Sequence, residues 1–294
     1  MVVHRAIALV LLASLLVAAG AAPASADPVQ QIGVQLTNVR PDGRFTVVFS
    51  LNSFDTSGGP PPEIFRSSLR VPRGVAIRPS FLRKDRLCDT LRLKTVLLDN
   101  ESDRRGGSDY FALLNDLART ERRIGPKLRP ADRRVLHTCR RAFLGRGKLL
   151  MDGRGAFADP LPGYVWVFLA KPRKEGSIGG FGMLGQTDQE SKVIQRSPFL
   201  LQQKPRLFAD IYNDPTPDGR YGYRVVLPRF KVSLLSFSVA ELRLAVTGIS
   251  RDGAFWAKLR CPARGSLSFR ADYRYVGGLR QRTTIAVPCP RYRL

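Results

Sequence analysis

Apolar and polar residues alternate along much of the chain. Residues 44–51 and residues 266–275 each carry an apolar side chain at every second position. The apolar positions are Phe45, Val47, Phe49 and Leu51 in the first segment and Leu267, Phe269, Ala271, Tyr273 and Tyr275 in the second. Such alternation is typical of antiparallel strands that bury one face and expose the other.

Turn-forming dipeptides separate several of these segments. They are Asp42-Gly43, Asp218-Gly219, Asp252-Gly253 and Gly277-Gly278. Gly and Asp tolerate the positive φ of tight hairpin turns. We therefore predict a mainly β protein made of two antiparallel β-sandwich units of immunoglobulin-like type, residues 27–198 and residues 199–294.

One region has a helical pattern instead. After Ser108, a candidate N-cap, apolar residues recur at helical spacing as far as a Gly125-Pro126 stop. A second helix is expected to follow it, and a third is expected near residues 80–92. We predict a small helical insertion at about residues 80–142 of the first unit.

Residues 1–26 have the pattern of a signal peptide. Arg5 precedes an apolar run over residues 6–19, and small residues at 24–26 match what a signal peptidase recognises. We expect the mature chain to begin near Asp27 and to carry no transmembrane anchor, because no later apolar run is long enough. The protein is then secreted, or associated with the cell envelope.

The chain is strongly basic, with 48 Lys and Arg against 24 Asp and Glu and a formal net charge of +24. Outside a cell this charge attracts polyanions such as anionic envelope polymers, although a generic solvated surface has the same composition. The cations are densest around the helical insertion, which makes it the candidate polyanion-binding site. Its candidate residues are Arg122, Arg123, Arg129, Arg133, Arg134, Arg140 and Arg141.

The mature chain holds four cysteines, Cys88, Cys139, Cys261 and Cys289. An even number of cysteines in an exported protein indicates disulfide bonds, and four cysteines allow three pairings. Cys261 and Cys289 both fall on the apolar side of predicted strands, so they can meet in the core. Cys88 paired with Cys139 then ties the insertion to the sheet, which makes both predicted bonds local.

Three stretches combine these cysteines with β patterns. They are LRVPRGVAIRPSFLRKDRLC, CRRAFLGRGKLLMD and CPARGSLSFRADYRYVGGLRQRTTIAVPC. They resemble recurring blocks of a group of signal-bearing, β-rich proteins of high-GC bacteria. The chain departs from that group at Arg140, where proline is usual, and at Gly277-Gly278, where Asp-Gly is usual. The resemblance implies export, a β architecture and the two local cysteine pairs, and it implies no activity.

Two glycine-rich motifs invite comparison with nucleotide sites. Gly180, Gly182 and Gly185 have the G-x-G-x-x-G spacing, but a dinucleotide fingerprint opens a helix directly after a strand. GRGK, residues 145–148, lacks the first glycine and the Ser or Thr of a phosphate loop. We predict a glycine-rich loop at the first motif, a turn at the second, and no nucleotide cofactor.

Catalytic and metal-binding patterns are few. His137 is the only histidine after the signal peptide, and the cysteines are not spaced for zinc. Two carboxylate clusters are available, Asp188 with Glu190 and the group Asp210, Asp214 and Asp218. We expect turn chemistry to explain the second cluster. Trp166 and Trp256 are candidates either for a carbohydrate platform or for a second core layer.

The sequence therefore indicates an exported, non-catalytic binding or structural protein of the cell envelope, with no metal and no cofactor. The alternative is an envelope glycan hydrolase that uses paired carboxylates. The two hypotheses differ in the surface they require. A hydrolase needs a concave pocket with close carboxylates, whereas a binder of polymers needs a flat basic or aromatic surface.

Overall fold

The structure of the protein is a computed structural model. It describes residues 28–289 except 57–58, 60–62, 83–84, 101–102, 105–106, 109, 153–158, 189–205, 229–230, 233–234, 237, 250–252 and 263–264. The predicted signal peptide and Glu190 lie outside the described residues.

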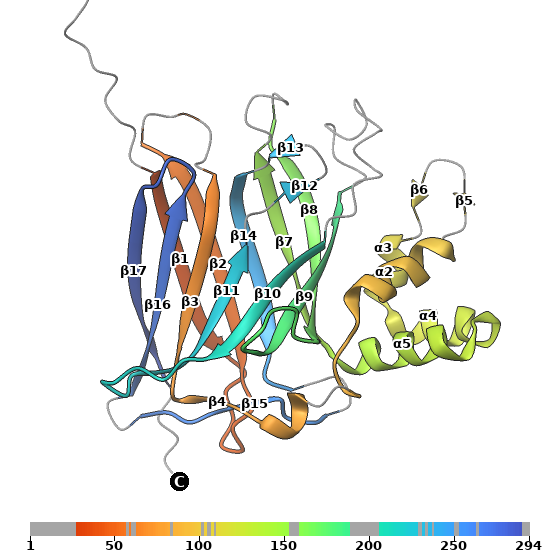
Figure 1. Ribbon diagram of the computed structural model, residues 1–294, viewed down its shortest axis with the longest axis horizontal. Helices are drawn as coiled ribbons and strands as arrows, with labels where there is room; N and C mark the ends of the chain where they lie inside the picture. Colours follow the sequence, from red (N-terminus) through yellow and green to blue (C-terminus); the bar gives the residue numbers. More distant parts are fainter. Residues whose placement is uncertain are drawn as a thin grey trace, which may run out of the picture.

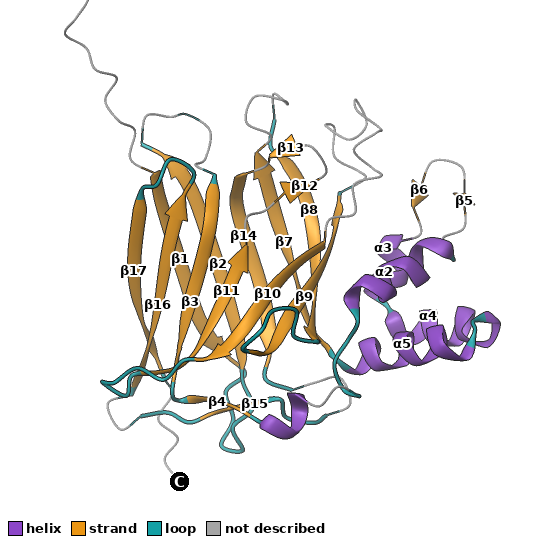
Figure 2. Ribbon diagram, in the orientation of Figure 1, coloured by secondary structure: helices purple, strands orange, loops and turns teal. Residues whose placement is uncertain are grey.

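A large antiparallel sheet forms most of the molecule (Figure 1, Figure 2). Its strands are β1 (Pro28–Thr37), β2 (Thr46–Asp55), β3 (Ile64–Pro72), β7 (Phe143–Asp152), β8 (Leu161–Ala170), β9 (Ser177–Thr187), β10 (Arg206–Asn213), β11 (Tyr221–Pro228), β14 (Ser238–Thr247), β16 (Ser266–Tyr275) and β17 (Arg280–Pro288). These 11 strands pair in the order β1-β2-β14-β7-β8-β9-β10-β11-β3-β16-β17.

The sheet curves until its two edge strands, β1 and β17, lie beside each other, so it is nearly barrel-shaped (Figure 1). Side chains join these edges. The Gln281 Oε1 accepts hydrogen bonds from the backbone N–H of Gln30 at 3.1 Å and from the Tyr275 hydroxyl at 2.6 Å. The Gln30 side chain in turn donates to the Ser53 hydroxyl on β2. The seam between the edges is therefore a polar side-chain network.

Three short ladders lie outside the large sheet. They join β4 (Val75–Ile77) with β15 (Ala257–Leu259), β5 (Asp103–Arg104) with β6 (Gly107–Ser108), and β12 (Lys231–Val232) with β13 (Leu235–Ser236). The β4–β15 ladder lies across one end of the curved sheet (Figure 1). Trp256 is buried there, and its indole N–H donates to the Thr247 carbonyl oxygen at 2.6 Å. This end is therefore packed with apolar side chains.

The α-helices lie together on one side of the sheet and form a helical layer, whereas the short helix η1 (Pro79–Leu82) lies beside the β4–β15 ladder (Figure 2). The bounds of the other helices are α2 (Thr90–Asp99), α3 (Tyr110–Asn115), α4 (Leu117–Ile124), η2 (Gly125–Lys127) and α5 (Pro130–Arg141). The single helix predicted after Ser108 is two helices. The Asp116 side chain accepts a hydrogen bond from the backbone N–H of Arg119 and so caps a new helix, α4.

Apolar residues of β8 are buried on both faces of the sheet. Val167 points into the curved sheet and Val165 shares its face by strand alternation, whereas Trp166 and Phe168 lie on the outer face. The Phe111 ring of α3 packs edge-on against Trp166 with ring centroids 5.4 Å apart. This explains why the sequence of β8 is continuously apolar instead of alternating.

The predicted antiparallel, mainly β character is confirmed, and the helices that the structure describes fall within residues 79–141. Cys88 is bonded to Cys139 and Cys261 to Cys289, as predicted, with Cα atoms 4.5 Å and 5.7 Å apart. The two sandwich units are not confirmed. β14 lies between β2 and β7, and β16 lies beside β3, so strands from both sides of residue 198 share one sheet.

The predicted loop at Gly180, Gly182 and Gly185 is wrong, because these glycines lie inside strand β9. A side chain at Gly180 would collide with the Phe208 ring of β10, and one at Gly182 would collide with Thr90 of α2. The glycines therefore serve close packing between extended strands and a helix. GRGK likewise lies inside strand β7 and not in a turn.

Candidate functional site

The curved sheet encloses an apolar cavity of about 210 Å³. The strands that contribute side chains to its wall are β1, β2, β3, β8, β9, β10, β11, β14 and β16, and the β4–β15 end contributes Val75, Ile77 and Trp256. Typical wall residues are Ile32, Phe49, Leu69, Met183, Leu227 and Phe269. The described residues that line the cavity carry no charge. Its polar lining residues are Ser50, Ser67, Ser68 and Tyr273, and nearly all of its wall surface is apolar.

Strand alternation aims these side chains inward. On β16, Phe269, Ala271 and Tyr273 face the cavity, whereas Arg270 and Asp272 between them face outward and form an ion pair at 3.2 Å. Ala271 is opposite Leu69 of the neighbouring β3, and both line the cavity. The same alternation that the sequence predicted therefore separates an apolar interior from a charged exterior.

Small residues at inward positions leave the space unfilled. Ala209 on β10 and Ala271 on β16 are both buried and line the cavity, as does Ser67 on β3. Protein interiors hold few voids larger than a water molecule. A dry apolar cavity of about 150 Å³ is already large enough to bind benzene, so this cavity has room for a small apolar group.

Strand β16 carries two buried tyrosines, Tyr273 in the cavity wall and Tyr275 two positions further along the strand. Burial raises the pKa of Tyr275 to about 12, and burial followed by the neighbouring Tyr275 raises the pKa of Tyr273 further. Both phenols therefore stay protonated at neutral pH, where each can donate a hydrogen bond but cannot act as a base.

Sequence reasoning placed Phe49 and Phe269 on buried strand faces but did not foresee a cavity. In a sandwich, these faces pack against a second sheet. Here they face one another across one curved sheet. The available signal was the small size of Ala209 and Ala271 at inward positions of otherwise bulky strands.

The predicted polyanion site lies on the helical layer. Arg122 and Arg123 are on α4, Arg129 directly precedes α5, and Arg133, Arg134, Arg140 and Arg141 are on α5. Several of these side chains are engaged within the protein. The Arg140 guanidinium is 2.6 Å from Glu121, and Arg133 donates to the carbonyl oxygens of Gly125 and Pro126. Polymer binding by this surface stays a prediction.

Two carboxylates of the second cluster, Asp214 and Asp218, interact with neighbouring side chains. Asp214 pairs with Arg70 at 3.2 Å and with Arg224 at 2.9 Å. Asp218 accepts from the Thr216 hydroxyl, and this hydrogen bond lowers the pKa of the Asp218 carboxyl. A general acid in glycoside hydrolysis needs a raised pKa instead. The shift at Asp218 therefore favours the predicted turn chemistry.

The other candidate residues predicted from the sequence are two carboxylates, one histidine and two tryptophans. Asp188 lies at the end of β9 beside the Tyr164 hydroxyl at 3.5 Å, and Asp210 is buried on β10. His137 is half-exposed, with its Nδ1 2.8 Å from Glu121. Trp166 and Trp256 are both buried, so they belong to the core and not to an exposed carbohydrate platform.

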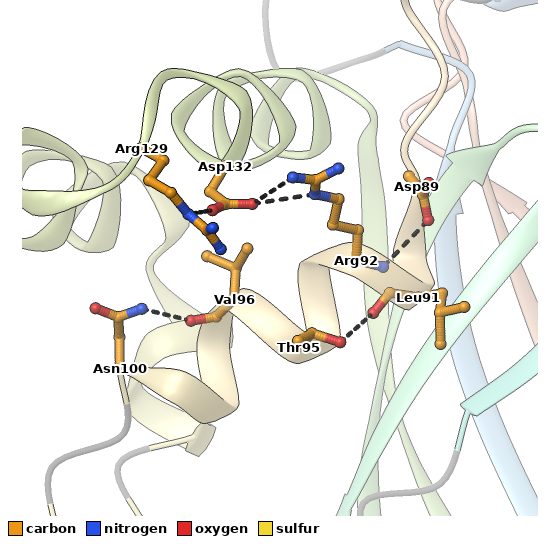
Figure 3. A network of polar contacts seen from close by, with 8 residues as sticks. All are labelled: Asp89, Leu91, Arg92, Thr95, Val96, Asn100, Arg129 and Asp132. Carbon is orange, nitrogen blue, oxygen red and sulfur yellow. Dashed lines mark hydrogen bonds and ion pairs between the residues drawn. The ribbon is translucent and has the colours of Figure 1, made fainter.

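One polar network joins α2 to the start of α5 (Figure 3). Asp132, buried near the start of α5, accepts from the Arg92 Nε of α2 at 3.0 Å through Oδ1 and from the Arg129 Nε at 3.2 Å through Oδ2. Asp89 caps α2 by accepting from the backbone N–H of Arg92. Asp132 therefore couples α2 to α5 (Figure 3).

Replacing Asp132 with alanine is expected to lower the free energy of unfolding by about 1–3 kcal/mol, because charge-assisted bonds from two guanidinium groups are lost. Arg129→Ala is the matched control. Its side chain is 86% exposed, so its loss is expected to cost less than about 1 kcal/mol. Urea unfolding followed by circular dichroism measures both. Equal effects of the two substitutions would contradict the central position of Asp132.

No protein family model, curated protein or solved structure matches this chain. The resemblance to β-rich proteins of high-GC bacteria therefore stays a hypothesis. Among the described residues, no helix is long and apolar enough to cross a membrane. The part of the chain that the structure describes also contains no group of three or more His, Cys, Asp or Glu side chains arranged to hold a metal ion.

Proposed function

We propose that this protein is a non-catalytic binding protein that holds an apolar ligand, such as a hydrocarbon chain, inside the curved sheet. The observation that carries the proposal is the uncharged cavity of about 210 Å³ between inward-facing strands. Ligand sites in proteins are concave and mostly apolar, with a few placed polar groups. Ser67 and Tyr273 are among the few polar residues that line this cavity.

The energetics favour an occupant without charge. Each methylene group moved from water into an apolar site contributes about 0.8 kcal/mol, whereas an ionised group in the same place finds no counter-ion among the described lining residues. The protonated Tyr273 hydroxyl offers a donor to an ester, hydroxyl or protonated acid at the polar end of such a ligand. We therefore place the chain of the ligand among Leu69, Met183 and Phe269.

The two functions predicted from the sequence receive different support. The cavity lining that the structure describes holds no carboxylate pair for a glycan hydrolase, and nothing in the described surface favours that chemistry. Binding of an anionic polymer by the helical layer is a separate hypothesis, because it uses the outer arginines and not the cavity. A secreted or envelope-associated carrier is compatible with both disulfide bonds.

The test is a titration with N-phenylnaphthylamine, a neutral fluorophore that brightens in apolar surroundings. The wild-type protein is expected to bind it with saturable fluorescence. Ala271→Phe fills the cavity from β16 and is expected to weaken binding at least tenfold. The matched control is Ala286→Phe, which adds the same ring at an exposed position of the neighbouring β17.

A second variant tests the cavity without filling it, in case Ala271→Phe fails to fold. Phe49→Ala removes a ring from the cavity wall and is expected to retain or strengthen binding, and circular dichroism checks that all variants are folded. Failure of the wild-type protein to bind the fluorophore would overturn the proposal. Equal binding by Ala271→Phe and Ala286→Phe would also overturn it, because the probe would then lie outside the cavity.

A further inference from the structure

One end of the curved sheet exposes apolar side chains. It is the end opposite the β4–β15 ladder, where β16 turns into β17 and β3 begins (Figure 1). Phe65 is 46% exposed, Val276 is 51% exposed and Leu279 is 48% exposed. The backbone N–H of Val276 donates to the Glu63 carbonyl oxygen at 3.0 Å, which holds the turn beside the start of β3. We name Phe65, Val276 and Leu279 the apolar tip.

Three arginines lie in a row directly beside the apolar tip. Arg66 of β3 is opposite Arg274 of β16, which is opposite Arg280 of β17. All three side chains are exposed. The Arg274 guanidinium lies over the Phe65 ring, 5.5 Å from its centroid, so the charged row and the apolar tip are in contact.

Like charges directly opposite one another on a sheet are destabilising. No described carboxylate pairs with Arg66, Arg274 or Arg280. The nearby Asp272 is engaged by Arg270 at 3.2 Å and by Arg282 at 2.7 Å. The three guanidinium groups therefore repel one another, and a bound anion would reduce this repulsion.

The arginine row also lines a surface groove of about 490 Å³. Arg224 and Arg282 contribute to its wall, and Asp272 is the only carboxylate among the described lining residues. The groove is concave and strongly positive, with room for an anionic group such as a phosphate ester. Strands β16 and β17, which carry most of these residues, lie on the side of the molecule away from the helical layer (Figure 1).

We infer that the apolar tip and the arginine row together form a docking surface for an anionic lipid bilayer. Juxtaposed apolar and basic side chains match the boundary between acyl chains and anionic headgroups. Phe65, Val276 and Leu279 enter the boundary, and the arginines contact headgroup phosphates. A nucleic acid or a soluble polyanion would use the arginines but would leave the apolar tip in water.

This inference goes beyond the proposed apolar ligand and does not depend on it, because every residue of the docking surface is exposed and none of them lines the cavity. The test is co-sedimentation of the full chain with vesicles of equal parts phosphatidylglycerol and phosphatidylcholine, and with vesicles of phosphatidylcholine alone. Wild-type protein is expected to bind the anionic vesicles at least tenfold more tightly than the neutral ones.

Two variants separate the contributions. Arg66→Glu, Arg274→Glu and Arg280→Glu combined are expected to reduce binding to the anionic vesicles at least tenfold. Phe65→Ser with Leu279→Ser is expected to reduce it at least threefold while leaving the charge unchanged. The matched control combines Arg40→Glu, Lys171→Glu and Lys174→Glu, which makes the same charge change at exposed positions outside both the docking surface and the candidate polyanion-binding site.

The outcomes distinguish the alternatives. Equal loss in the control variant would mean that net charge alone drives binding and would overturn the inference. Unchanged binding in the Phe65→Ser, Leu279→Ser variant, together with equally tight binding to duplex DNA, would assign the row to soluble polyanions instead. Fluorophore binding measured on the same variants is expected to stay at the wild-type level, so failure here is separable from failure of the cavity proposal.

Discussion

Replacing Cys88 and Cys139 together by serine is expected to lower the free energy of unfolding by about 4 kcal/mol. The bond joins residues 51 positions apart. In the chain-entropy model, a bond that closes a loop of this length lowers the entropy of the unfolded chain, and its removal costs about 4 kcal/mol of stability. The bond also fixes α5 to the sheet, because the backbone N–H of Cys88 donates to the Leu169 carbonyl oxygen of β8 at 2.9 Å. Its loss is expected to loosen the helical layer first.

Urea unfolding of the oxidised protein, followed by far-ultraviolet circular dichroism, measures this effect. The comparison variant replaces Cys261 and Cys289, which are 28 positions apart, and its expected loss is about 3.5 kcal/mol in the same model. Limited proteolysis locates the loosened region. We expect early cleavage within residues 90–141 of the first variant and not of the second. An unchanged unfolding midpoint in the first variant would contradict the prediction.

Replacing Trp166 with alanine is expected to lower the free energy of unfolding by about 3–5 kcal/mol. Trp166 is the largest fully buried side chain among the described residues and lies between β8 and the helices. Its ring packs against Phe111 of α3, with centroids 5.4 Å apart. Truncation to alanine leaves a cavity at this interface, because the sheet and the helices are held apart by their other contacts.

Trp166→Phe is the matched control for this prediction. It keeps an aromatic ring at the interface, and it removes an indole N–H that has no hydrogen-bond partner among the described residues. We therefore expect a loss below about 1.5 kcal/mol for this volume-reducing but apolar exchange. Circular dichroism follows both variants without relying on tryptophan fluorescence. A loss below about 1 kcal/mol in Trp166→Ala would mean that the helices do not depend on this contact.

Local patterns predicted much of the fold. The alternation in residues 266–275 became β16, and the apolar phase of Cys261 and Cys289 correctly indicated that they meet. These successes share a cause, since strand alternation and turn chemistry depend on residues within a few positions of one another. The same locality explains the error at β9. Glycines are frequent in loops, but here the missing side chains of Gly180 and Gly182 leave room for Phe208 and Thr90, which are distant in sequence.

The sequence by itself determined strands such as β16, the location of the helices and the two disulfide pairs, but not strand β9. The tertiary structure alone decided that one curved sheet, and not two sandwiches, collects those strands. It also decided that Arg66, Arg274 and Arg280 lie side by side and that Ala209 and Ala271 border one cavity. Alternation specifies which face of a strand is buried, but it does not specify which other apolar face packs against it. Which strands become neighbours depends on sheet twist and on the fit of side chains across the whole sheet.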